Sequence, residues 1–530
     1  MEFANLADFV RRAAAADPDR AALHYAPAGG AGRTISWREL DAGVDAVARG
    51  LTALDLPGGG HPARVAVALP NVPEFASVLF GVLRAGLVAV PVNPGYTGRE
   101  VSHVLSDSGA HVLVATGEVV TAAGGAAPVH TFPVAGPDDL AALTGPVPDG
   151  PAGAAPVPGD AGGGPAGERL AMLLYTSGTS GAPKGAMLPH RALIANHVQL
   201  AELQIAGPDD TVLLALPLFH AYGLNIGLGT VAYHGATGVL VDDFSPRATL
   251  ELIERHRVTV LIGVPDMFAA WAAAGDDAGR ALRSVRVAVS GAAPLPRQVA
   301  ERFAATTGIE VQVGYGLTET APVLTSTLAG PALKPGSIGR PVPGVELRLV
   351  GDVVADEEED ELSVELGTPG TDPGEIEVRG ANVFTGYWPD GAGGPDRDGW
   401  WATGDVAYAD ADGDLFLVDR IGELILVSGF NVYPHEVELV LAAHPAVAEA
   451  AVIGVPHELT GQAVQAFVVP AAGAAPTQAE LAAHCTANLA RFKCPSSIVF
   501  IAELPHSPTG KVRKTLLPAT TVPDRGDQDG

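Results

Sequence analysis

The sequence predicts an α/β protein in which a large N-terminal domain, built from two α/β sheet subdomains and a β-rich subdomain, precedes a small α+β domain. A chain of 530 residues is longer than one ordinary hydrophobic core requires. Short apolar runs alternate with helical stretches in two successive segments, which is typical of parallel sheets. After Asp419 the pattern changes to short strands and compact helices.

The first α/β segment begins at Arg64. The predicted elements are strands at Val65–Leu69, Leu87–Val92 and near Val112, with one helix after Pro73 and another from Thr97. The later stretch Gly145–Gly167 is almost wholly glycine, proline and alanine. Such a composition buries too little apolar surface to order itself, so we expect a mobile loop or linker there.

The second α/β segment leads into a β-rich segment. The predicted elements are strand Leu170–Tyr175, a helix from His190, strand Thr211–Leu216, helix Ala248–Arg257, and strands Val258–Ile262, Val285–Ser290 and Glu375–Val378. A dense acidic run, Asp352–Glu361, interrupts the β-rich part, and we interpret it as a solvated hairpin tip.

The small domain is predicted to follow the β-rich segment. Its expected elements are strands Leu424–Val427, Val447–Val455, Ala463–Val469 and Ile498–Ile501, with helices Pro434–Ala442 and Thr477–Leu489. The mixture of short strands with few helices indicates an α+β rather than an α/β arrangement.

Composition excludes several classes of function. The formal net charge of −28 argues against nucleic acid or an anionic membrane as a partner, because both require a basic surface. The two cysteines, Cys485 and Cys494, have neither metal-ligand spacing nor a disulfide framework, which suits a reducing cytoplasm. Met1–Arg12 lacks a signal pattern, and Arg84 interrupts the longest apolar run, Phe75–Val92. We therefore expect a cytoplasmic monomer or homodimer without a transmembrane segment.

The segment Tyr175–Lys184 carries the strongest chemical signal. Its candidate phosphate-binding residues are Thr176, Ser177, Gly178, Thr179, Ser180, Gly181 and Lys184. Glycines permit close backbone approach, hydroxyl and amide groups donate to phosphate oxygens, and lysine adds a compact positive charge. The spacing differs from that of a Walker loop. A flexible turn with a solvated lysine rarely combines all of these features, so we interpret the segment as a polyphosphate-binding loop.

This loop resembles the phosphate-loop signature of the adenylate-forming superfamily, which includes acyl- and aryl-coenzyme A synthetases, firefly luciferases and the adenylation domains of nonribosomal peptide synthetases. Further motifs follow in the order of that superfamily and cover most of the chain. They are similar to its substrate-pocket motif at Leu216–Gly223, adenine-pocket turn at Ser290–Pro294, adenylate-binding loop at Gly314–Thr320, ribose motif at Trp401–Asp405, hinge at Asp419–Arg420 and C-terminal lysine motif at Pro508–Lys511.

The resemblance implies a nucleotide site. Glu319 would bind Mg²⁺, since one carboxylate beside substrate phosphates commonly holds that ion. Thr318 would donate to the α-phosphate, and the ring of Tyr315 would cover the adenine. Asp405 and Arg420 would bind the ribose hydroxyls, and their structural alternatives are an Asx turn and a local ion pair. The remaining nucleotide-binding residues implied are Gly291, Ala292, Ala293, Gly314 and Gly316.

The resemblance also implies that the small domain is mobile. The predicted boundaries are 1–419 for the N-terminal domain, 420–422 for the hinge and 423–530 for the C-terminal domain. One orientation would deliver Lys511 to stabilise charge during attack on the α-phosphate, and a face around Ser428 and Gly429 would serve thioester formation. A solvated basic tail is the alternative for Lys511. The predicted catalytic residues are Lys511, Lys184, Thr318 and His220.

The substrate pocket implied by the resemblance is mostly apolar. It comprises His220, Tyr222, Val264, Met267, Phe268 and Gly291. Amino-acid-activating relatives carry an aspartate where this chain has Phe219-His220-Ala221, so a simple α-amino acid is disfavoured. A lone histidine in such a position is as often a packed core residue as a ligand contact.

The implied activity is ligation of an apolar carboxylic acid to coenzyme A, dependent on ATP and Mg²⁺ and passing through an acyl-AMP intermediate. A long- or medium-chain fatty acid is the first expectation, and an aryl acid of the 4-coumarate kind is the alternative. A fatty acyl-AMP ligase that loads a carrier protein would need an extra packed segment, for which Asp352–Glu361 is too polar. A non-catalytic nucleotide sensor is disfavoured, because every motif residue for catalysis is present.

Overall fold

The computed structural model describes residues 3–26, 32–54, 56–57, 61–144, 166–176, 183–351, 371–420, 425–427, 430–457, 460–489, 491–507 and 510–518. The chain forms two compact units, and each is described by itself. Unit 1 comprises Met1–Leu333, Pro341–Glu346 and Arg379–Trp401, and unit 2 comprises Lys334–Arg340, Leu347–Val378 and Ala402–Gly530. Nearly all of the predicted linker Gly145–Gly167, and all of the acidic run Asp352–Glu361, lie outside the described residues.

The first sheet of unit 1 has six strands in the order β6-β5-β3-β4-β7-β8. They are β3 (Arg64–Ala68), β4 (Val88–Pro91), β5 (Val112–Ala115), β6 (His130–Pro133), β7 (Leu170–Thr176) and β8 (Lys184–Pro189). Neighbouring strands are parallel except for β7 and β8, which form an antiparallel hairpin. This sheet confirms the predicted parallel α/β arrangement, whereas β8 was not predicted.

Several helices lie in the N-terminal part of unit 1. They are α1 (Asp8–Ala16), α2 (Trp37–Ala53), α3 (Pro73–Arg84), α4 (Gly98–Ser108), α5 (Gly117–Ala123) and α6 (Ala141–Thr144). Of these, α3 and α5 pack directly against strands of the first sheet. Helix α4 begins at a capping box, in which the Thr97 side chain accepts from the Glu100 N–H and the Glu100 side chain accepts from the Thr97 N–H. Its buried residues, including Val101 and Val104, join Val90 of the sheet in one apolar cluster.

The second sheet of unit 1 has nine strands in the order β15-β14-β13-β12-β11-β9-β10-β1-β2. They are β1 (Ala21–Tyr25), β2 (Arg33–Ser36), β9 (Thr211–Leu214), β10 (Thr237–Leu240), β11 (Val260–Gly263), β12 (Val287–Ser290), β13 (Val311–Gly316), β14 (Val323–Ser326) and β15 (Arg340–Pro341). Strands β9 to β13 are parallel. Ligands in such sheets bind at the carboxyl ends of the strands.

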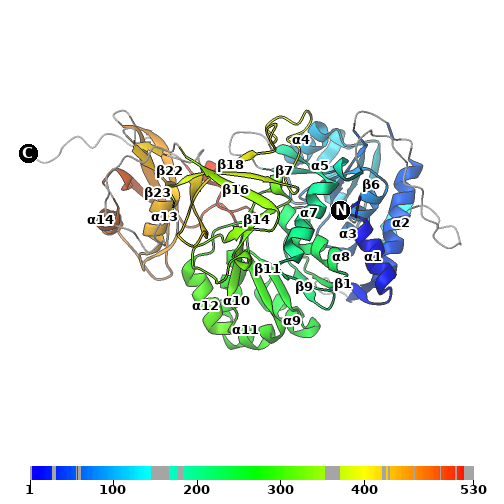
Figure 1. Ribbon diagram of the computed structural model, residues 1–530, viewed down its shortest axis with the longest axis horizontal. Helices are drawn as coiled ribbons and strands as arrows, with labels where there is room; N and C mark the ends of the chain where they lie inside the picture. Colours follow the sequence, from blue (N-terminus) through cyan, green and yellow to red (C-terminus); the bar gives the residue numbers. More distant parts are fainter. Residues whose placement is uncertain are drawn as a thin grey trace, which may run out of the picture. The chain divides into compact units, whose positions relative to one another are not determined.

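Several helices connect the strands of the second sheet. They are α7 (His190–Ala201), a π-helical segment (Tyr222–Gly229), α8 (Thr230–His234), α9 (Pro246–His256), α10 (Pro265–Ala273), α11 (Asp276–Ala281) and α12 (Arg297–Thr307). Figure 1 shows α9, α10, α11 and α12 gathered beside β9 and β11. The helices α9 and α10 each carry a proline in the first turn, where its missing N–H costs no hydrogen bond.

Unit 2 contains a five-stranded sheet and most residues of a four-stranded sheet, whose strand order is β16-β17-β18-β19. The strands are β16 (Val345–Val350), β17 (Gly374–Gly380), β18 (Trp401–Ala409), β19 (Leu415–Arg420), β20 (Ile425–Val427), β21 (Phe430–Val432), β22 (Val447–His457), β23 (Gly461–Pro470) and β24 (Ser497–Phe500). Strands β20 to β24, with the two helices described next, confirm the predicted small α+β domain.

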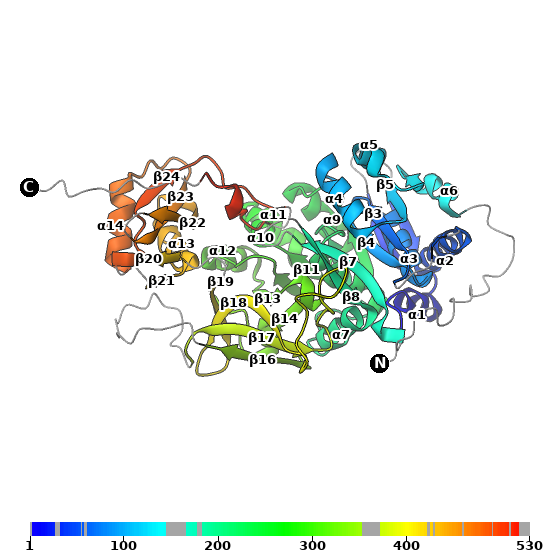
Figure 2. The same ribbon diagram turned by 90° about the horizontal axis from the view of Figure 1, so that it is seen from above.

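Two helices of unit 2 cover one face of the five-stranded sheet (Figure 2). They are α13 (Pro434–Ala442) and α14 (Gln478–Asn488). Val437 of α13 and Leu481 of α14 are fully buried in one cluster with Val464 of β23. Among the described residues of both units, no helix has the length and apolarity that crossing a bilayer requires.

Candidate active site

The hairpin of β7 and β8 carries the predicted phosphate loop at its tip. Thr176 and Lys184 lie opposite each other in the strand register, so the hairpin brings the two ends of the loop together. The intervening predicted residues Ser177, Gly178, Thr179, Ser180 and Gly181 lie outside the described residues. Beside the tip, the Tyr175 hydroxyl donates to Asp107 Oδ2 at 2.6 Å. The exposed Lys184 is therefore presented from an anchored strand pair.

The predicted metal ligand Glu319 lies in a 3₁₀ turn, Thr318–Thr320, directly after β13. Its side chain is only 6% exposed, which a carboxylate tolerates only with polar partners. The Tyr387 hydroxyl donates to Glu319 Oε1 at 2.7 Å, and the Phe384 N–H donates to the Glu319 carbonyl at 2.8 Å. Glu319 is thus a supported carboxylate inside unit 1 rather than a surface glutamate.

Three buried asparagines hold the loop that follows Glu319. Asn196 Nδ2 donates to the Val323 carbonyl at 2.8 Å, and Asn382 Nδ2 donates to the Thr320 carbonyl at 2.8 Å. Asn225 Nδ2 donates to the Ala321 carbonyl at 2.7 Å. These side chains are at most 1% exposed, so their hydrogen bonds replace those that water would supply. The sequence analysis missed all three, because their partners lie 62 to 127 residues away along the chain.

The segment Thr385–Trp388 lies beside β8 and joins it to the Glu319 turn. The Met187 N–H donates to the Gly386 carbonyl at 3.0 Å, and the Trp388 N–H donates to the Gly185 carbonyl at 2.8 Å. These bonds place the ring of Tyr387 5.5 Å from Lys184 Nζ. Tyr387 is a site residue that sequence analysis missed, although Gly386-Tyr387-Trp388 is an available signal.

The donor set fits Mg²⁺ only when nucleotide phosphates complete the coordination. Among the described residues, no group of three or more His, Cys, Asp or Glu side chains could hold a metal ion. Glu319 offers one carboxylate, and no described residue hydrogen-bonds to its Oε2 atom. Mg²⁺ is commonly held by one or two carboxylates, several waters and substrate phosphates, so this arrangement suits a metal that arrives with ATP.

An apolar cavity, here called the inner cavity, opens at the carboxyl ends of β12 and β13. Of the predicted residues, Tyr222, Gly291, Ala292, Gly314, Tyr315 and Gly316 line it. The sequence analysis missed its other lining residues, which are Leu200, Ile205, Ile226, Ile262, Val289, Pro322, Val323 and Ser326. Its volume is about 40 Å³, measured over the positions open to the centre of a water-sized sphere. The wall is therefore mostly aliphatic, with aromatic rings from Tyr222 and Tyr315.

Tyr222 and Gly291 meet at the wall of the inner cavity. A Cβ atom added at Gly291 would lie 2.9 Å from Tyr222 Cζ, so glycine is required for the ring to lie there. The adjacent Ala292 has a φ of 66°, a left-handed conformation that is uncommon for alanine and is often found at ligand sites. The predicted adenine-pocket turn is thus both tight and strained.

His220 does not line the inner cavity, but its protonation state is defined. Its Nδ1 accepts a hydrogen bond from the Tyr222 N–H at 3.2 Å, so the neutral ring carries its proton on Nε2. Burial lowers the pKa of His220 from 6.5 to about 4, because the charged ring would lose hydration. At neutral pH His220 is therefore an uncharged hydrogen-bond donor.

The other predicted pocket residues belong to a neighbouring part of the core. Val264, Met267 and Phe268 are 6%, 5% and 0% exposed and are not among the residues that line the inner cavity. The Phe268 ring packs edge-on against Trp271 and Phe303, with centroid separations of 5.5 and 5.1 Å. The structure therefore groups Phe268 with the aromatic core beneath α10.

The predicted ribose-binding residues lie on a hairpin of unit 2. Asp405 on β18 pairs with the backbone of Arg420 on β19, and Asp405 is 5% exposed. The side chain of Arg420 lies outside the described residues, as do Gly422 of the predicted hinge and both Ser428 and Gly429. The register alone puts the two predicted ribose contacts side by side on neighbouring strands.

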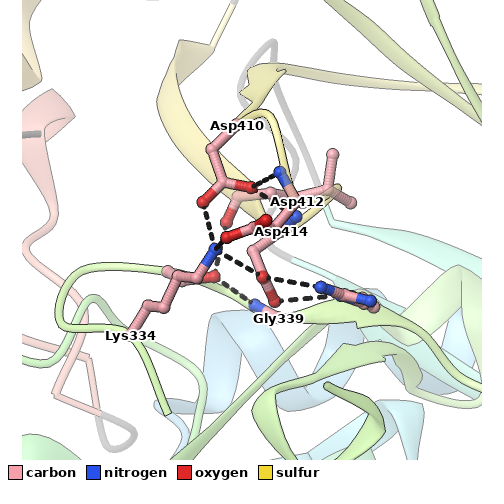
Figure 3. Close-up of polar contacts among 8 residues, drawn as sticks. Lys334, Gly339, Asp410, Asp412 and Asp414 are labelled. Atoms are coloured by element: carbon pink, nitrogen blue, oxygen red, sulfur yellow. Dashed lines mark hydrogen bonds and ion pairs between the residues drawn. The ribbon is translucent and has the colours of Figure 1, made fainter. Parts of the chain in front are cut away.

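A lysine and three aspartates fix the turn of that hairpin. Lys334 Nζ lies 2.5, 2.7 and 2.9 Å from carboxylate oxygens of Asp410, Asp412 and Asp414 (Figure 3). The three carboxylates raise the pKa of Lys334, chiefly through the hydrogen bond to Asp410. Within the turn, the N–H groups of Asp412 and Asp414 donate to Asp410 Oδ1. The Lys334 ammonium thus occupies the centre of an acidic loop and offsets part of its negative charge, and Arg340 also pairs with Asp414 at 3.1 Å.

Lys511 lies in a separate tight turn of unit 2. The Ser507 N–H donates to the Lys511 carbonyl at 2.8 Å, and the Lys511 N–H donates to Ser507 Oγ at 3.1 Å. Gly510, with a φ of 77°, supplies the left-handed residue of the turn. Lys511 is exposed, and its backbone N–H and carbonyl are both hydrogen-bonded to Ser507.

Known proteins resemble this chain over nearly its full length. Residues 10–388 match the AMP-binding enzyme family, and residues 436–511 match the AMP-binding enzyme C-terminal domain. A feruloyl-CoA synthase of Amycolatopsis sp is 38% identical over 487 residues, which cover 91% of this chain and 93% of that protein. A long-chain-fatty-acid–CoA ligase of Yersinia pestis is 36% identical over 551 residues and covered to 94%, as is this chain.

A solved structure gives the same result in three dimensions. The ATP-bound MatB of Rhodopseudomonas palustris superimposes with a TM-score of 0.82 at 31% identity, covering 96% of this chain and 98% of that one. Fold and sequence thus agree over nearly the whole chain. The chain therefore belongs to the AMP-binding enzyme family and is an ATP-dependent acid–CoA ligase that uses ATP, Mg²⁺ and coenzyme A.

Proposed function

We propose that this ligase activates a compact apolar carboxylic acid, with aryl acids favoured over long-chain fatty acids. The inner cavity carries this proposal, because Tyr222 and Gly291 of the predicted acid pocket line it next to residues predicted for the nucleotide. Its aliphatic wall offers no charged partner, and its volume is only about 40 Å³. An apolar cavity that binds benzene has a volume of roughly 150 Å³. A ring can be admitted by a limited shift of side chains such as Tyr222, whereas a long acyl chain requires a larger rearrangement.

In the first half-reaction, an oxygen of the acid's carboxylate attacks the α-phosphorus of ATP, and pyrophosphate leaves. Lys184 and the phosphate loop bind the departing phosphates, and Thr318 donates to the α-phosphate. Glu319 would hold Mg²⁺, which would neutralise phosphate charge. The neutral His220 presents its Nε2–H to the acid. In-line displacement of this kind needs positioning and charge neutralisation more than a nucleophilic side chain.

In the second half-reaction, the sulfur of coenzyme A attacks the acyl carbonyl, the C–S bond forms, and AMP leaves. We assign Asp405 and Arg420 to binding of the ribose hydroxyls in both half-reactions. Lys511 is assigned to the first half-reaction, where it would stabilise the charge that develops during adenylation; a positioned cation of this kind often raises the rate by a factor on the order of 10²–10³. Thioester formation is assigned to the face around Ser428 and Gly429. We further propose that residues 420–422 form a hinge between domains 1–419 and 423–530, so that the smaller domain can present a different face in each half-reaction.

A long- or medium-chain fatty acid is the second candidate. It is favoured by the likeness to the fatty-acid ligase, which at 36% identity is nearly as similar as the feruloyl-CoA synthase at 38%. The fatty chain would lie along the same aliphatic wall, with Leu200 and Ile205 displaced. Chain length therefore becomes the variable that separates the two candidates.

A panel of acids tests the proposal. Pyrophosphate release should be measured with benzoic, cinnamic, hexanoic, decanoic and hexadecanoic acids, each with and without coenzyme A. We expect the highest kcat/KM for an aryl acid and a thioester product only with coenzyme A. Preference for hexadecanoic acid would favour the second candidate. Adenylate without thioester would instead identify an acyl-AMP ligase, and ATP binding without pyrophosphate release would identify a sensor.

We also propose that the enzyme works in the reducing cytoplasm. The support is chemical, because Cys485 and Cys494 are free thiols, and burial raises the pKa of Cys485 to about 12. Such a thiol is unreactive. A monomer or homodimer remains the prediction for the oligomeric state, and light scattering coupled to size-exclusion chromatography measures it directly.

A further inference from the structure

One side chain of unit 1 contacts two of the predicted site residues, although they come from different parts of the chain. The Tyr387 hydroxyl donates to Glu319 Oε1 at 2.7 Å, across a separation of 68 residues. The face of the same ring lies 5.5 Å from Lys184 Nζ. Lys184 begins β8 beside the phosphate loop, and Glu319 follows β13, so Tyr387 lies between two separate sheets of unit 1.

The backbone around Tyr387 is fixed on both sides. On the β8 side, the Thr385 N–H donates to the Met187 carbonyl at 3.1 Å and the Trp388 N–H donates to the Gly185 carbonyl at 2.8 Å. On the other side, the Phe384 N–H donates to the Glu319 carbonyl at 2.8 Å. The Phe384 ring packs edge-on against the Tyr387 ring, with centroids 5.1 Å apart. The position of the phenol is therefore determined by the fold and not by a mobile loop.

The chemistry of the contact defines its direction. An ionised carboxylate can only accept hydrogen bonds, so the phenol must donate its proton to Glu319 Oε1. This bond restrains rotation of the carboxylate and leaves Oε2 without a hydrogen bond among the described residues. The ring face, with its negative quadrupole, attracts the Lys184 ammonium. Loss of the hydroxyl and loss of the ring should therefore have separable effects.

We propose that Tyr387 is a positioning residue that orients the Glu319 carboxylate for Mg²⁺ and the Lys184 ammonium for the polyphosphate of ATP. This inference rests on the proposed function of those two residues. In this role Tyr387 acts through its two neighbours, Glu319 and Lys184. Residues that orient a metal ligand typically change metal affinity by about 10- to 100-fold when they are replaced.

The test uses Mn²⁺ as a paramagnetic substitute for Mg²⁺ and a non-hydrolysable ATP analogue. Electron paramagnetic resonance gives the Kd of Mn²⁺ in the presence of the analogue, for the wild type, Tyr387→Phe and Tyr387→Leu. We expect Tyr387→Phe to weaken Mn²⁺ binding by about 10- to 100-fold, while analogue binding without metal stays unchanged. Tyr387→Leu should weaken both, because Lys184 also loses its ring.

Activity supplies a second readout. In Tyr387→Phe, the Mg²⁺ concentration for half-maximal pyrophosphate release should rise, while kcat at saturating Mg²⁺ stays near that of the wild type. Tyr233→Phe is the matched control. Its ring packs against His197, 5.5 Å between centroids, and no described residue hydrogen-bonds to its hydroxyl. Thermal unfolding of each variant reports any general loss of stability.

The outcomes separate the inference from the function on which it rests. If the wild type binds Mn²⁺ and releases pyrophosphate but Tyr387→Phe matches it in both measurements, the positioning role is overturned and the function stands. An equal loss in Tyr233→Phe also overturns it. If the wild type neither binds Mn²⁺ with the analogue nor releases pyrophosphate with any acid, the proposed function and this inference both fail.

Discussion

Substitution of Gly291 by alanine should narrow the inner cavity and change acid selectivity. The new Cβ would lie 2.9, 3.0 and 3.1 Å from Cζ, Oη and Cε1 of Tyr222, whereas ordinary contacts begin at 3.4 Å. The ring, which is 7% exposed, must therefore move by about 0.5 Å at least. Overpacking of this kind costs about 1–3 kcal/mol. A change of one methylene in an apolar pocket alters kcat/KM by about 10- to 200-fold.

Pyrophosphate release measures the effect for acids of increasing width, from acetic to cinnamic acid. We expect Gly291→Ala to reduce kcat/KM by about 10-fold or more for cinnamic acid and much less for acetic acid. The ratio between the two acids is unaffected by a general folding defect. Gly117→Ala is the control, because an added Cβ there meets no atom within 4 Å. If the ratio of kcat/KM for cinnamic acid to that for acetic acid were unchanged in Gly291→Ala, the Tyr222 ring would not form a boundary of the acid site.

Three further predictions concern other parts of the molecule. Lys334→Met should loosen the turn at residues 410–414, which closes the hairpin that carries Asp405, and should weaken AMP binding, measured by calorimetry, by a factor between a few and about 100. Lys334→Arg should keep AMP affinity near that of the wild type, and equal AMP affinity in the two variants would contradict a role for the Lys334 ion pairs. Burial lowers the pKa of His197 from 6.5 to about 3, so as the pH falls the unfolded chain binds a proton at this histidine before the folded chain does. The contribution of neutral His197 to the free energy of unfolding is therefore complete above pH 6.5 and is lost progressively as the pH falls toward 3. His197→Gln should reduce this loss by about 1.4 kcal/mol per pH unit in urea titrations, and parallel pH profiles would refute it. Gly316→Ala places Cβ 1.8 Å from the Pro322 carbonyl oxygen and should lower the free energy of unfolding by about 3 kcal/mol or more; an unchanged midpoint in urea would be incompatible with this geometry.

Elements with strong local signals were predicted closely. The predicted helix Pro434–Ala442 agrees with α13 at both ends, because Pro434 occupies the first turn and apolar residues recur at helical spacing. The predicted strand Leu170–Tyr175 falls short of β7 by one residue. In contrast, β8 was missed, since its apolar residues run directly into α7 without a turn residue other than Pro189. The pairing of β1 with β10 is invisible locally, because it joins residues far apart in the sequence.

The candidate site shows the same division. Glu319 was predicted as a metal ligand because it lies in a compact motif, and the structure shows a buried carboxylate that accepts a hydrogen bond from Tyr387. Its support from Asn196, Asn225 and Tyr387 was not found, because each partner is distant along the chain. A motif identifies groups that are close in sequence, whereas their orientation depends on long-range packing.

The discontinuity of unit 1 has a consequence for biosynthesis. The chain leaves unit 1 after Leu333 and completes it only with Arg379–Trp401, the segment that contains Tyr387. Translation at about 5–20 residues per second separates Leu333 from Trp401 by roughly 3–14 s. During that interval the nascent chain holds the Glu319 carboxylate without its phenol partner. The ribosome must therefore synthesise the chain as far as Trp401 before Glu319 and Tyr387 can meet. A translational pause between Leu333 and Trp401 would expose the incomplete site to chaperones for longer.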